Sequence, residues 1–331
     1  MKIAVLGAGS WGTALATHLT RAGQKAILWG RSSELVEAIK KTHTNARYLK
    51  TETLPDFEVT ADLQQALQHV GMVVFAIPSE GIRELAQKIN GKIPSTAPLV
   101  STSKGLEHGS LKTMSEVLAE EFSDQLTDSR IAVLSGPSFA IEVIRSLPTA
   151  VTVASKSPDL ADLVSSVFHA ETFRVYASDD VVGVELGGVV KNVIAIAMGI
   201  VDGLGSGANA RAALLTRGIA ETARLMNACG AKPETVTSLG CLGDLILTAM
   251  TDLSRNRRVG LGLAEGKSLT AILQELGQVA EGVKSAEHVS ELALRYSVEM
   301  PITKEVYSII RGEKTPQQAM KSILSRPRGS E

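Results

Sequence analysis

The stretch 2-KIAVLGAGSWGTALATHLTRAGQKAILWGR-31 gives the clearest indication of the fold of the N-terminal half of the chain. It opens with KIAVLG, a short β-branched-rich run that is typical of a buried strand. Leu15 and Leu19 follow at helical spacing, Gly23 ends the predicted helix, and KAILWG reads as a second strand. The stretch therefore predicts one strand–helix–strand unit.

The same alternation continues toward residue 183. Helical segments, such as 111–122, lie between several of the further strands, and such alternation implies a mostly parallel sheet covered on both faces. The further buried strands are predicted at 71–78, 98–105, 130–137 and 148–155.

After about residue 183 the strand-like runs largely stop and helical spacing takes over. The last helical segment begins with Thr315-Pro316-Gln317-Gln318, a capping-box pattern with proline at the first helical position. We therefore predict an α/β domain over residues 1–183 and an all-α domain over residues 184–331. The predicted helices of the second domain cover 185–203, 208–229, 233–251, 256–265, 279–296, 302–311 and 316–325.

Composition excludes several classes of protein. The chain has 331 residues, 44% of them hydrophobic, which favours two domains over a single core. Lys plus Arg number 34 and Asp plus Glu 35, so no excess of positive charge indicates a nucleic-acid or anionic-membrane partner.

The cysteines and the N-terminus indicate the compartment. Cys229 and Cys241 form no CxxC pair, so we expect no metal site and a reducing environment, with both side chains acting as small core hydrophobes. The N-terminus has no signal-peptide pattern, and the longest apolar run, 193–201, is far shorter than the ~20 residues that span a bilayer. We therefore expect a soluble, cytoplasmic protein without stable membrane insertion.

Residues 7-GAGSWG-12 have the spacing G-x-G-x-x-G. Gly7, Gly9 and Gly12 permit a tight turn and close approach of a pyrophosphate, and the helix N-terminus supplies amide donors. The motif is weak alone, but its place between a strand and a helix predicts a Rossmann-type dinucleotide site rather than a purely structural turn. Ser10 and Trp11 lie in the turn and are expected near the phosphates, with simple packing as the alternative for Trp11.

The end of the second strand indicates which dinucleotide is bound. An acidic residue there would hold the ribose 2′-hydroxyl of NAD, but this chain has Gly30-Arg31-Ser32. Arg31 could pair with a 2′-phosphate and stack on adenine, which favours NADPH/NADP, with NADH also possible. The alternative is a solvated loop arginine.

Two further turns follow predicted strands. In 101-STSKGLE-107, Lys104 would point toward the crevice at the strand ends, where open α/β sheets bind ligands. In 135-SGPSFAIEV-143, Gly136 would let a ligand approach the backbone and Ser138 offers a hydroxyl. An exposed loop lysine and an ordinary strand-to-helix turn are the respective alternatives.

The helical half carries one charge in an apolar run, Lys191 in 186-LGGVVKNVIAIAMGIV-201, with Asn192 beside it as a possible orienting partner. Burying an ammonium is costly, so it indicates a function. Asp244, between glycines and apolar residues, could cap a helix or pair with a buried cation.

In 254-SRNRRVG-260, Ser254 is expected to cap a helix whose first turn holds Arg255 and Asn256, a good phosphate cradle. The alternative is a basic solvated turn, and Arg257 and Arg258 are interpreted in that way.

Taken together, these motifs resemble NAD(P)-dependent glycerol-3-phosphate dehydrogenases of the bacterial type. The matching pieces run in order from residue 5 to about residue 285, so the resemblance covers nearly the whole chain. One departure follows Tyr48-Leu49, where the family commonly has Pro-Gly and this chain has Lys50-Thr51. The matching pieces are GAGSWGTA, STSKGLE, SGPSFA, ELGGVVKNVIAIA, GCLGDL, SRNRRVG and 277-GQVAEGV-283.

The resemblance implies reversible reduction of dihydroxyacetone phosphate by NAD(P)H to sn-glycerol 3-phosphate, which feeds phospholipid synthesis. It implies that Lys191 is the proton donor and acceptor, and we place Lys104 and Asp244 with it in the catalytic set. It also implies a helical domain like that of 6-phosphogluconate dehydrogenases, from which we expect a homodimer. The implied substrate contacts are Lys104, Gly136, Ser138, Lys191, Asp244, Ser254, Arg255 and Asn256. The implied cofactor contacts beyond the three glycines are Ser10, Trp11, Arg31, Lys104, Ala140, Arg255, Val279 and Glu281.

Two rival functions remain open at this stage. A β-hydroxyacid-type NAD(P) dehydrogenase also places a lysine on the first helix after the Rossmann domain, but it would not need the phosphate cradle at 254–260. A non-catalytic NADP(H)-binding protein would have little use for Lys104, Lys191 and Asp244 together. Oxidation of NADPH with the triose phosphate would exclude both rivals, and activity only with a non-phosphorylated hydroxy acid would favour the β-hydroxyacid type.

Overall fold

The computed structural model describes residues 1–50, 52–123 and 129–327, and the chain divides into two compact units. One unit comprises Met1–Glu107 and Lys112–Glu185. The other comprises His108–Leu111 and Leu186–Glu331, so a short segment of the N-terminal half belongs to the helical unit.

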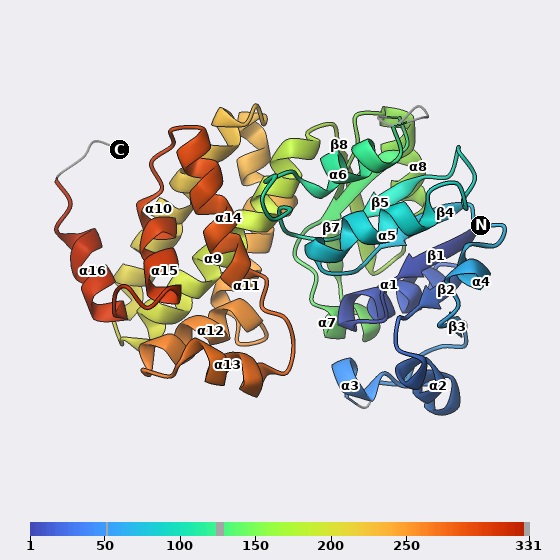
Figure 1. Cartoon of the computed structure of the whole chain (residues 1–331), viewed down its shortest axis with the longest axis horizontal. Helices are drawn as coiled ribbons and strands as arrows, with labels where there is room; N and C mark the ends of the chain where they lie inside the picture. The colour runs from blue at the N-terminus through green and yellow to red at the C-terminus, as the bar shows by residue number, and fades with distance from the viewer. Residues whose placement is uncertain (51, 124–128, 328–331) are drawn as a thin grey trace. The chain divides into compact units, whose positions relative to one another are not determined.

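The first unit is built on an eight-stranded sheet with the order β3-β2-β1-β4-β5-β6-β7-β8 (Figure 1). All neighbouring strands are parallel except β6 and β7. The order of the first six strands is that of a Rossmann-type fold, so the predicted fold class is confirmed. The strands are β1 (Lys2–Leu6), β2 (Lys25–Trp29), β3 (Glu58–Thr60), β4 (Met72–Phe75), β5 (Leu99–Ser101), β6 (Ile131–Ser135), β7 (Thr149–Ala154) and β8 (Phe173–Ser178).

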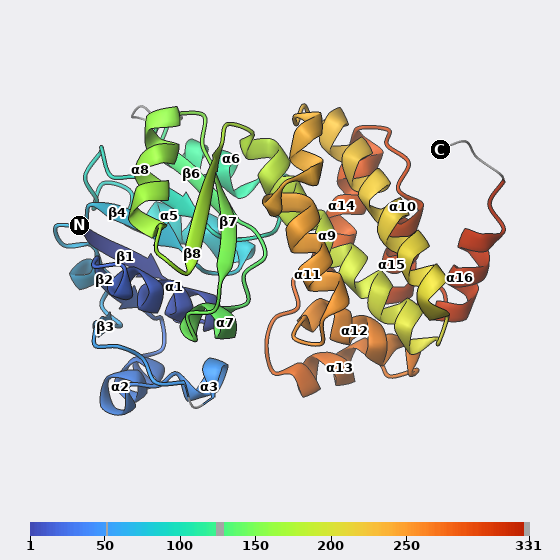
Figure 2. The ribbon, with the colours of Figure 1, turned by 180° about the vertical axis from the view of Figure 1, so that it is seen from behind.

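Both faces of the sheet are covered because side chains along each buried strand alternate between two cores. Ile3 and Val5 enter one core, and Ala4 and Leu6 enter the other. Helices α5 and α6 lie in front of the sheet in Figure 1, and α1, α7 and α8 lie in front in Figure 2. The helices are α1 (Ser10–Arg21), α2 (Ser33–Thr42), α3 (Ala46–Leu49), α4 (Leu63–Leu67), α5 (Ile82–Ile89), α6 (Met114–Glu121), α7 (Ala140–Ile144) and α8 (Pro158–Phe168), with a 3₁₀ turn η1 (Ser79–Gly81).

Two strands have no counterpart in the sequence prediction. Strands β3 and β8 form the two edges of the sheet. Strand β3 has three residues, and three of the six residues of β8 are exposed, so neither gives a long apolar run. Near the first edge, Lys50 ends α3 with a φ of 55°, a conformation closed to the proline that the family commonly has there. Thr51 lies outside the described residues.

The second unit is all-helical, as predicted. Helix α9 begins at Val181, within the last residues of the first unit, and continues to Gly203. By length and composition α9 is long and apolar enough to cross a membrane, although Lys191 and Asn192 interrupt its apolar run and no span was expected from the sequence. Its apolar window is entirely buried inside the protein, however, which is the behaviour of a core helix.

The remaining helices follow the predicted order with two corrections. The segment predicted as one helix over 233–251 is broken into a 3₁₀ turn, a π turn and a short α-helix, with glycines at 240 and 243 in the π turn. The predicted capping box at Thr315 is confirmed, whereas α13 was missed. The elements are α10 (Gly207–Ala228), η3 (Pro233–Thr237), η4 (Leu239–Gly243), α11 (Asp244–Met250), α12 (Arg255–Ala264), α13 (Leu269–Leu276), α14 (Gly282–Arg295), α15 (Pro301–Ile310) and α16 (Pro316–Leu324).

A buried carboxylate joins two of these helices. Glu221 on α10 accepts hydrogen bonds from the backbone N–H groups of Ile302 (2.6 Å) and Thr303 (3.3 Å) in the first turn of α15. Burial is the main cause that raises the pKa of Glu221 to about 7, and the hydrogen bonds oppose it. The start of α15 therefore depends on a side chain that titrates near neutrality.

Candidate functional site

The glycine-rich turn after β1 has the backbone geometry that the sequence predicted. Gly7 has a φ of 127°, and a Cβ atom there would collide with the carbonyl of Ala76. A Cβ atom on Gly12 would collide with the carbonyl of Gly7, so this glycine allows α1 to start tightly against the strand. A Cβ atom on Gly9 would meet nothing within 4 Å, so its face of the turn is open.

Helix α1 begins at Ser10 with Gly9 as its N-cap, and no side chain caps it. The amide groups of its first turn therefore sit beside the open face of Gly9, which is the arrangement that binds a pyrophosphate. Trp11 is partly buried against the core, so part of its side chain serves in packing, the alternative role considered from the sequence. These residues fit a dinucleotide phosphate group.

Asn45 supports this turn and was missed by the sequence analysis. Its Nδ2 donates to the carbonyl of Ala8 (3.1 Å) and to Oγ1 of Thr13 (2.8 Å), and the residue is fully buried. Asn45 lies 32 residues or more after the groups it holds, so no local pattern points to it. It ties the start of α3 to the turn.

Arg31 lies just after β2, the strand paired in parallel with β1. Its side chain is exposed, whereas Gly30 is buried and a Cβ atom there would come within 2.8 Å of Cβ of Ala8 in the turn. The end of β2 therefore packs directly against the glycine-rich turn. The exposed guanidinium of Arg31, one residue after Gly30, is therefore suitably placed along the chain to contact a nucleotide bound at this turn.

Lys104, Gly136 and Ser138 come together in the structure. The carbonyl of Gly136 accepts from Nζ of Lys104 (3.4 Å) and from Oγ of Ser138 (3.0 Å). Gly136 has a φ of 145°, and a Cβ atom there would come within 2.8 Å of Cα of Val151, so only glycine suits the position. Ala140 starts α7 directly after this turn.

Lys191 is held by two side chains of the helical unit. Its Nζ lies 2.8 Å from Oδ1 of Asp244 and 2.8 Å from Oγ1 of Thr248. Lys191 is 7% exposed and Asp244 1%, so this is a buried ion pair. Asp244 is thus the partner of a buried cation, the second of the two roles considered from sequence. Thr248 was not predicted from the sequence, although it lies four residues after Asp244 on α11 and therefore on the same face of that helix.

Close packing brings Asp244 to Lys191. A Cβ atom on Gly187, one helical turn before Lys191, would come within 2.8 Å of Cβ of Cys241 in the π turn η4. The missing side chain lets η4, and with it the start of α11, approach α9. Burial, with a smaller effect from Asp244, raises the pKa of the Cys241 thiol to about 12, so this cysteine is no nucleophile at neutral pH.

Helix α12 packs on α9 in the same way. A Cβ atom on Gly199 would collide with the carbonyl of Arg257, and one on Gly260 with the carbonyl of Ile196. This contact fixes the N-terminus of α12, where Oγ of Ser254 caps the helix by accepting from the amide of Arg257, as predicted.

The interpretation of Arg257 as solvated is wrong. Its guanidinium is buried and pairs with Asp202 (2.6 Å) and with Asp252. Asp202 lies near the end of α9, so Arg257 joins α12 to that helix. Arg258 is exposed, as expected.

Asn256 connects three elements. Its Nδ2 donates to Oδ1 of Asn192 on α9 (2.8 Å), and its Oδ1 accepts from the amide of Gly282 at the start of α14 (3.0 Å). The side chain of Asn192 thus bonds to Asn256 of the predicted cradle and not to Lys191, the partner expected from the sequence. Arg255 is exposed and donates to the carbonyl of Val279 (2.9 Å), two residues before Glu281, the N-cap of α14.

The predicted residues therefore form two groups, each within its own unit. The glycine-rich turn, Arg31 and the Lys104–Gly136–Ser138 cluster belong to the sheet unit. The Lys191–Asp244 pair, the start of α12 and the Val279–Glu281 segment belong to the helical unit.

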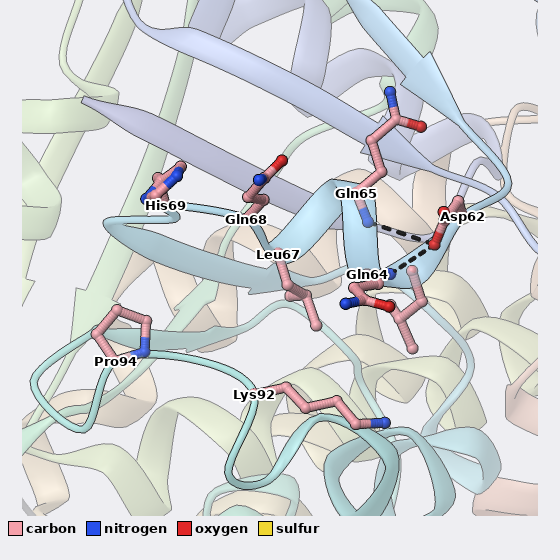
Figure 3. Close-up of a pocket in the computed structure, with 9 residues that line it drawn as sticks. Asp62, Gln64, Gln65, Leu67, Gln68, His69, Lys92 and Pro94 are labelled. Carbon is pink, nitrogen blue, oxygen red and sulfur yellow. Dashed lines mark hydrogen bonds between the residues drawn. The ribbon is translucent and has the colours of Figure 1, made fainter.

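A surface hollow elsewhere in the sheet unit contains none of these residues. It has a volume of about 730 Å³ and lies between α4 and the chain around Lys92 and Pro94 (Figure 3). Asp62, at its rim, accepts from the amides of Gln64 and Gln65 and so serves as the cap of α4. The hollow has no part in the predicted chemistry.

Comparison with known proteins covers both units. A family described as NAD-dependent glycerol-3-phosphate dehydrogenase N-terminus matches residues 2–161, and one described as the C-terminus of the same enzyme matches residues 180–321. A glycerol-3-phosphate dehydrogenase [NAD(P)+] of Anaeromyxobacter dehalogenans (strain 2CP-C) is 48% identical, covering 98% of each chain. That of Stenotrophomonas maltophilia (strain K279a) is 45% identical, covering 98% of this chain and 95% of the relative. The crystal structure of glycerol-3-phosphate dehydrogenase from Coxiella burnetii is similar with a TM-score of 0.93 and 42% identity, covering 98% of this chain and 99% of the other.

Proposed function

The chain belongs to the NAD-dependent glycerol-3-phosphate dehydrogenase family, and from that premise we propose how its residues carry out the reaction. The protein is an oxidoreductase that interconverts dihydroxyacetone phosphate and sn-glycerol 3-phosphate with NAD(P)H. The product is a precursor for glycerophospholipids. The β-hydroxyacid-type and non-catalytic alternatives are not favoured.

The observation that carries the mechanism is the buried Lys191. When bound, NAD(P)H supplies the hydride that the carbonyl carbon accepts, and negative charge builds on the carbonyl oxygen. The Lys191 ammonium polarises that oxygen and gives it the proton that completes the alcohol. In the reverse direction the neutral Lys191 amine takes the proton from the alcohol. Such general acid–base help is worth ~10²–10⁴ in rate.

Asp244 and Thr248 hold the lysine for this work. Two of the donors on Nζ are directed to Asp244 and Thr248, which fixes the ammonium at the end of a flexible chain. The Asp244 carboxylate also compensates the charge when Lys191 is protonated. Lys104 serves as a second cation for the substrate, and Gly136 and Ser138 provide contacts beside it.

The sheet unit, residues 1–183 in our assignment, binds the cofactor. The open face of Gly9 and the amides after Ser10 receive the pyrophosphate, and Arg31 pairs with the 2′-phosphate of NADPH. NADH is accepted without that pairing. Trp11, Ala140, Arg255, Val279 and Glu281 complete the contacts.

The helical unit, residues 184–331, binds the substrate. The start of α12 carries Ser254, Arg255 and Asn256, and the helix dipole adds to the charge of Arg255 in holding the phosphate. Anchoring the phosphate positions the carbonyl carbon for hydride transfer. A substrate without the phosphate should therefore react much more slowly.

A direct test follows NADPH oxidation at 340 nm with dihydroxyacetone phosphate and, separately, with dihydroxyacetone. We expect rapid oxidation with the first and at least a hundredfold lower kcat/KM with the second, about 3 kcal/mol of lost phosphate binding. Equal rates would contradict the phosphate cradle. Activity only with a non-phosphorylated hydroxy acid would favour the β-hydroxyacid-type function.

The protein has the fold of a soluble dehydrogenase, and we further propose a cytoplasmic homodimer formed through the helical unit. Cys229 and Cys241 are not joined in a disulfide, which suits a reducing compartment. Leu294 and Leu324 of the helical unit are 78% and 77% exposed and could be covered by a second copy. Light scattering on the purified protein decides between monomer and dimer.

A further inference from the structure

Three side chains with metal-binding atoms meet in the helical unit, and none of them is assigned to the reaction. His108 comes from the short segment His108–Leu111, and Glu287 and His288 come from α14. Their ligand atoms all lie within 4.8 Å of one another. Glu287 and His288 are about 180 residues from His108, so the sequence analysis, which expected no metal site, gave no sign of them.

The distance between the two histidines suits a shared metal ion. Nδ1 of His108 lies 3.4 Å from Nε2 of His288. Hydrogen bonds from a ring N–H are typically about 2.9–3.0 Å, so this pair is long for a direct bond. Two nitrogens bound to one zinc ion at about 2.0–2.1 Å with tetrahedral angles lie about 3.3–3.4 Å apart. The separation therefore matches an edge of a zinc tetrahedron.

The third ligand is within reach of the same point. The Glu287 carboxylate is half-buried, and its Oε1 accepts from the hydroxyl of Tyr307 on α15 (3.3 Å). Hydrogen bonds of this kind orient carboxylates that bind metals. Arg311 in turn contacts Tyr307 through a hydrogen bond to its hydroxyl (3.4 Å).

The segment that carries His108 is held against α14 independently of the histidines. Nη1 of Arg295, the last residue of α14, donates to the carbonyl of Ser110 (3.1 Å). His288 is buried and His108 is exposed, so the cluster has one firmly packed ligand and one open to solvent. An ion could enter from the side of His108.

We propose that His108, Glu287 and His288 form a binding site for Zn²⁺, with a water molecule as the fourth ligand. Two imidazoles and one carboxylate are a donor set that zinc uses with an open position. Imidazole ligands favour zinc over Mg²⁺, which prefers oxygen ligands alone. The ion would fasten the segment 108–111 to α14.

A zinc ion that joins the segment 108–111 to α14 would act next to residues with proposed roles in the reaction. His108 lies four residues after Lys104, and α14 begins at Gly282, directly after Glu281. A bound ion would restrict both segments and so alter turnover without entering the reaction. The zinc site itself does not depend on the proposed function, because it rests only on the three ligands.

The test is an isothermal calorimetric titration of the metal-free, full-length protein with ZnCl₂ alone at pH 7.5. We expect one equivalent bound per chain, with no such binding of MgCl₂. His108→Asn should weaken zinc binding by at least about tenfold, and Glu287→Gln should also weaken it.

His69→Asn is the matched control. His69 is also exposed, lies in the sheet unit and has a φ of 56°, a conformation that asparagine tolerates. This variant should bind zinc like the wild type. With Co²⁺ in place of Zn²⁺, visible absorption bands of a tetrahedral ion should appear in the wild type and in His69→Asn and be lost in His108→Asn.

Two results would overturn the proposal. One is the absence of saturable zinc binding in the wild type. The other is equal zinc affinity of the wild type and His108→Asn, which would place the ion elsewhere on the surface. Since His108 is exposed, its replacement should leave the thermal unfolding of the metal-free protein unchanged, so folding does not confuse the comparison.

Discussion

Replacing Asp244 with Asn separates the structural part of the Lys191 pair from its catalytic part. The substitution keeps the shape of the side chain but removes the carboxylate charge 2.8 Å from the buried ammonium. Breaking one side of a buried ion pair typically costs about 3–5 kcal/mol, a large share of the 5–15 kcal/mol that stabilises a whole protein. We expect a loss of that size in the free energy of unfolding.

The assay is urea unfolding, with the loss of helix measured by far-UV circular dichroism. Both tryptophans, Trp11 and Trp29, lie in the sheet unit, so tryptophan fluorescence reports the unfolding of that unit separately. The urea midpoint of the fluorescence change should therefore differ little between the wild type and Asp244→Asn. Thr248→Val is the matched control, because it removes an uncharged partner of the same ammonium. That hydrogen bond is charge-assisted, so its loss should cost about 1.5–3 kcal/mol, less than the loss of the carboxylate.

A double variant completes the experiment. Adding Lys191→Met to Asp244→Asn removes the buried charge and should recover most of the lost stability while activity stays low. If Asp244→Asn costs no more than Thr248→Val, the pair does not hold the helices together as the structure indicates. If the double variant regains activity, the mechanism is wrong.

Three further predictions concern other parts of the protein. Arg31→Ala should raise the KM for NADPH by about tenfold or more and leave that for NADH nearly unchanged, and equal losses for both would contradict a 2′-phosphate contact. Asn45→Ala removes two buried hydrogen bonds from the glycine-rich turn and should weaken NADPH binding, measured by fluorescence titration, by about 1–3 kcal/mol, whereas unchanged affinity would show that the turn is rigid without it. Since the pKa of Glu221 rises from 4.5 to about 7 on folding, its contribution is full only at low pH and is lost as the pH rises through 7. Between pH 5 and pH 8 the wild type should therefore lose about 2–3 kcal/mol of unfolding free energy relative to Glu221→Gln, and parallel urea curves would refute this.

The Rossmann-type sheet was predictable because its central strands are buried on both faces and read as apolar runs. Ile3 to Leu6 show this directly, since every one of them is fully buried. The edge strands β3 and β8 lack that signal because solvent covers part of them. The prediction failed at 233–251 because helical spacing continues through Gly240 and Gly243, where the backbone forms a π turn.

Local sequence motifs identified the proposed catalytic residues but not the side chains that hold them in position. Lys191 stood out as a charge in an apolar run, and Asp244 was one of its possible partners. Thr248 and Asn45 carry no motif of their own, because their importance comes from contacts made only in the folded chain. Arg257 was misjudged for the same reason, since its partner Asp202 lies 55 residues earlier.

The central claim is that Lys191 moves the proton, and turnover of Lys191→Ala with saturating dihydroxyacetone phosphate and NADPH tests it most directly. Lys304→Ala, which removes an exposed lysine of α15, serves as the control. We predict that kcat of Lys191→Ala falls at least about a hundredfold while NADPH binding is retained. Near-normal turnover in Lys191→Ala would contradict the account.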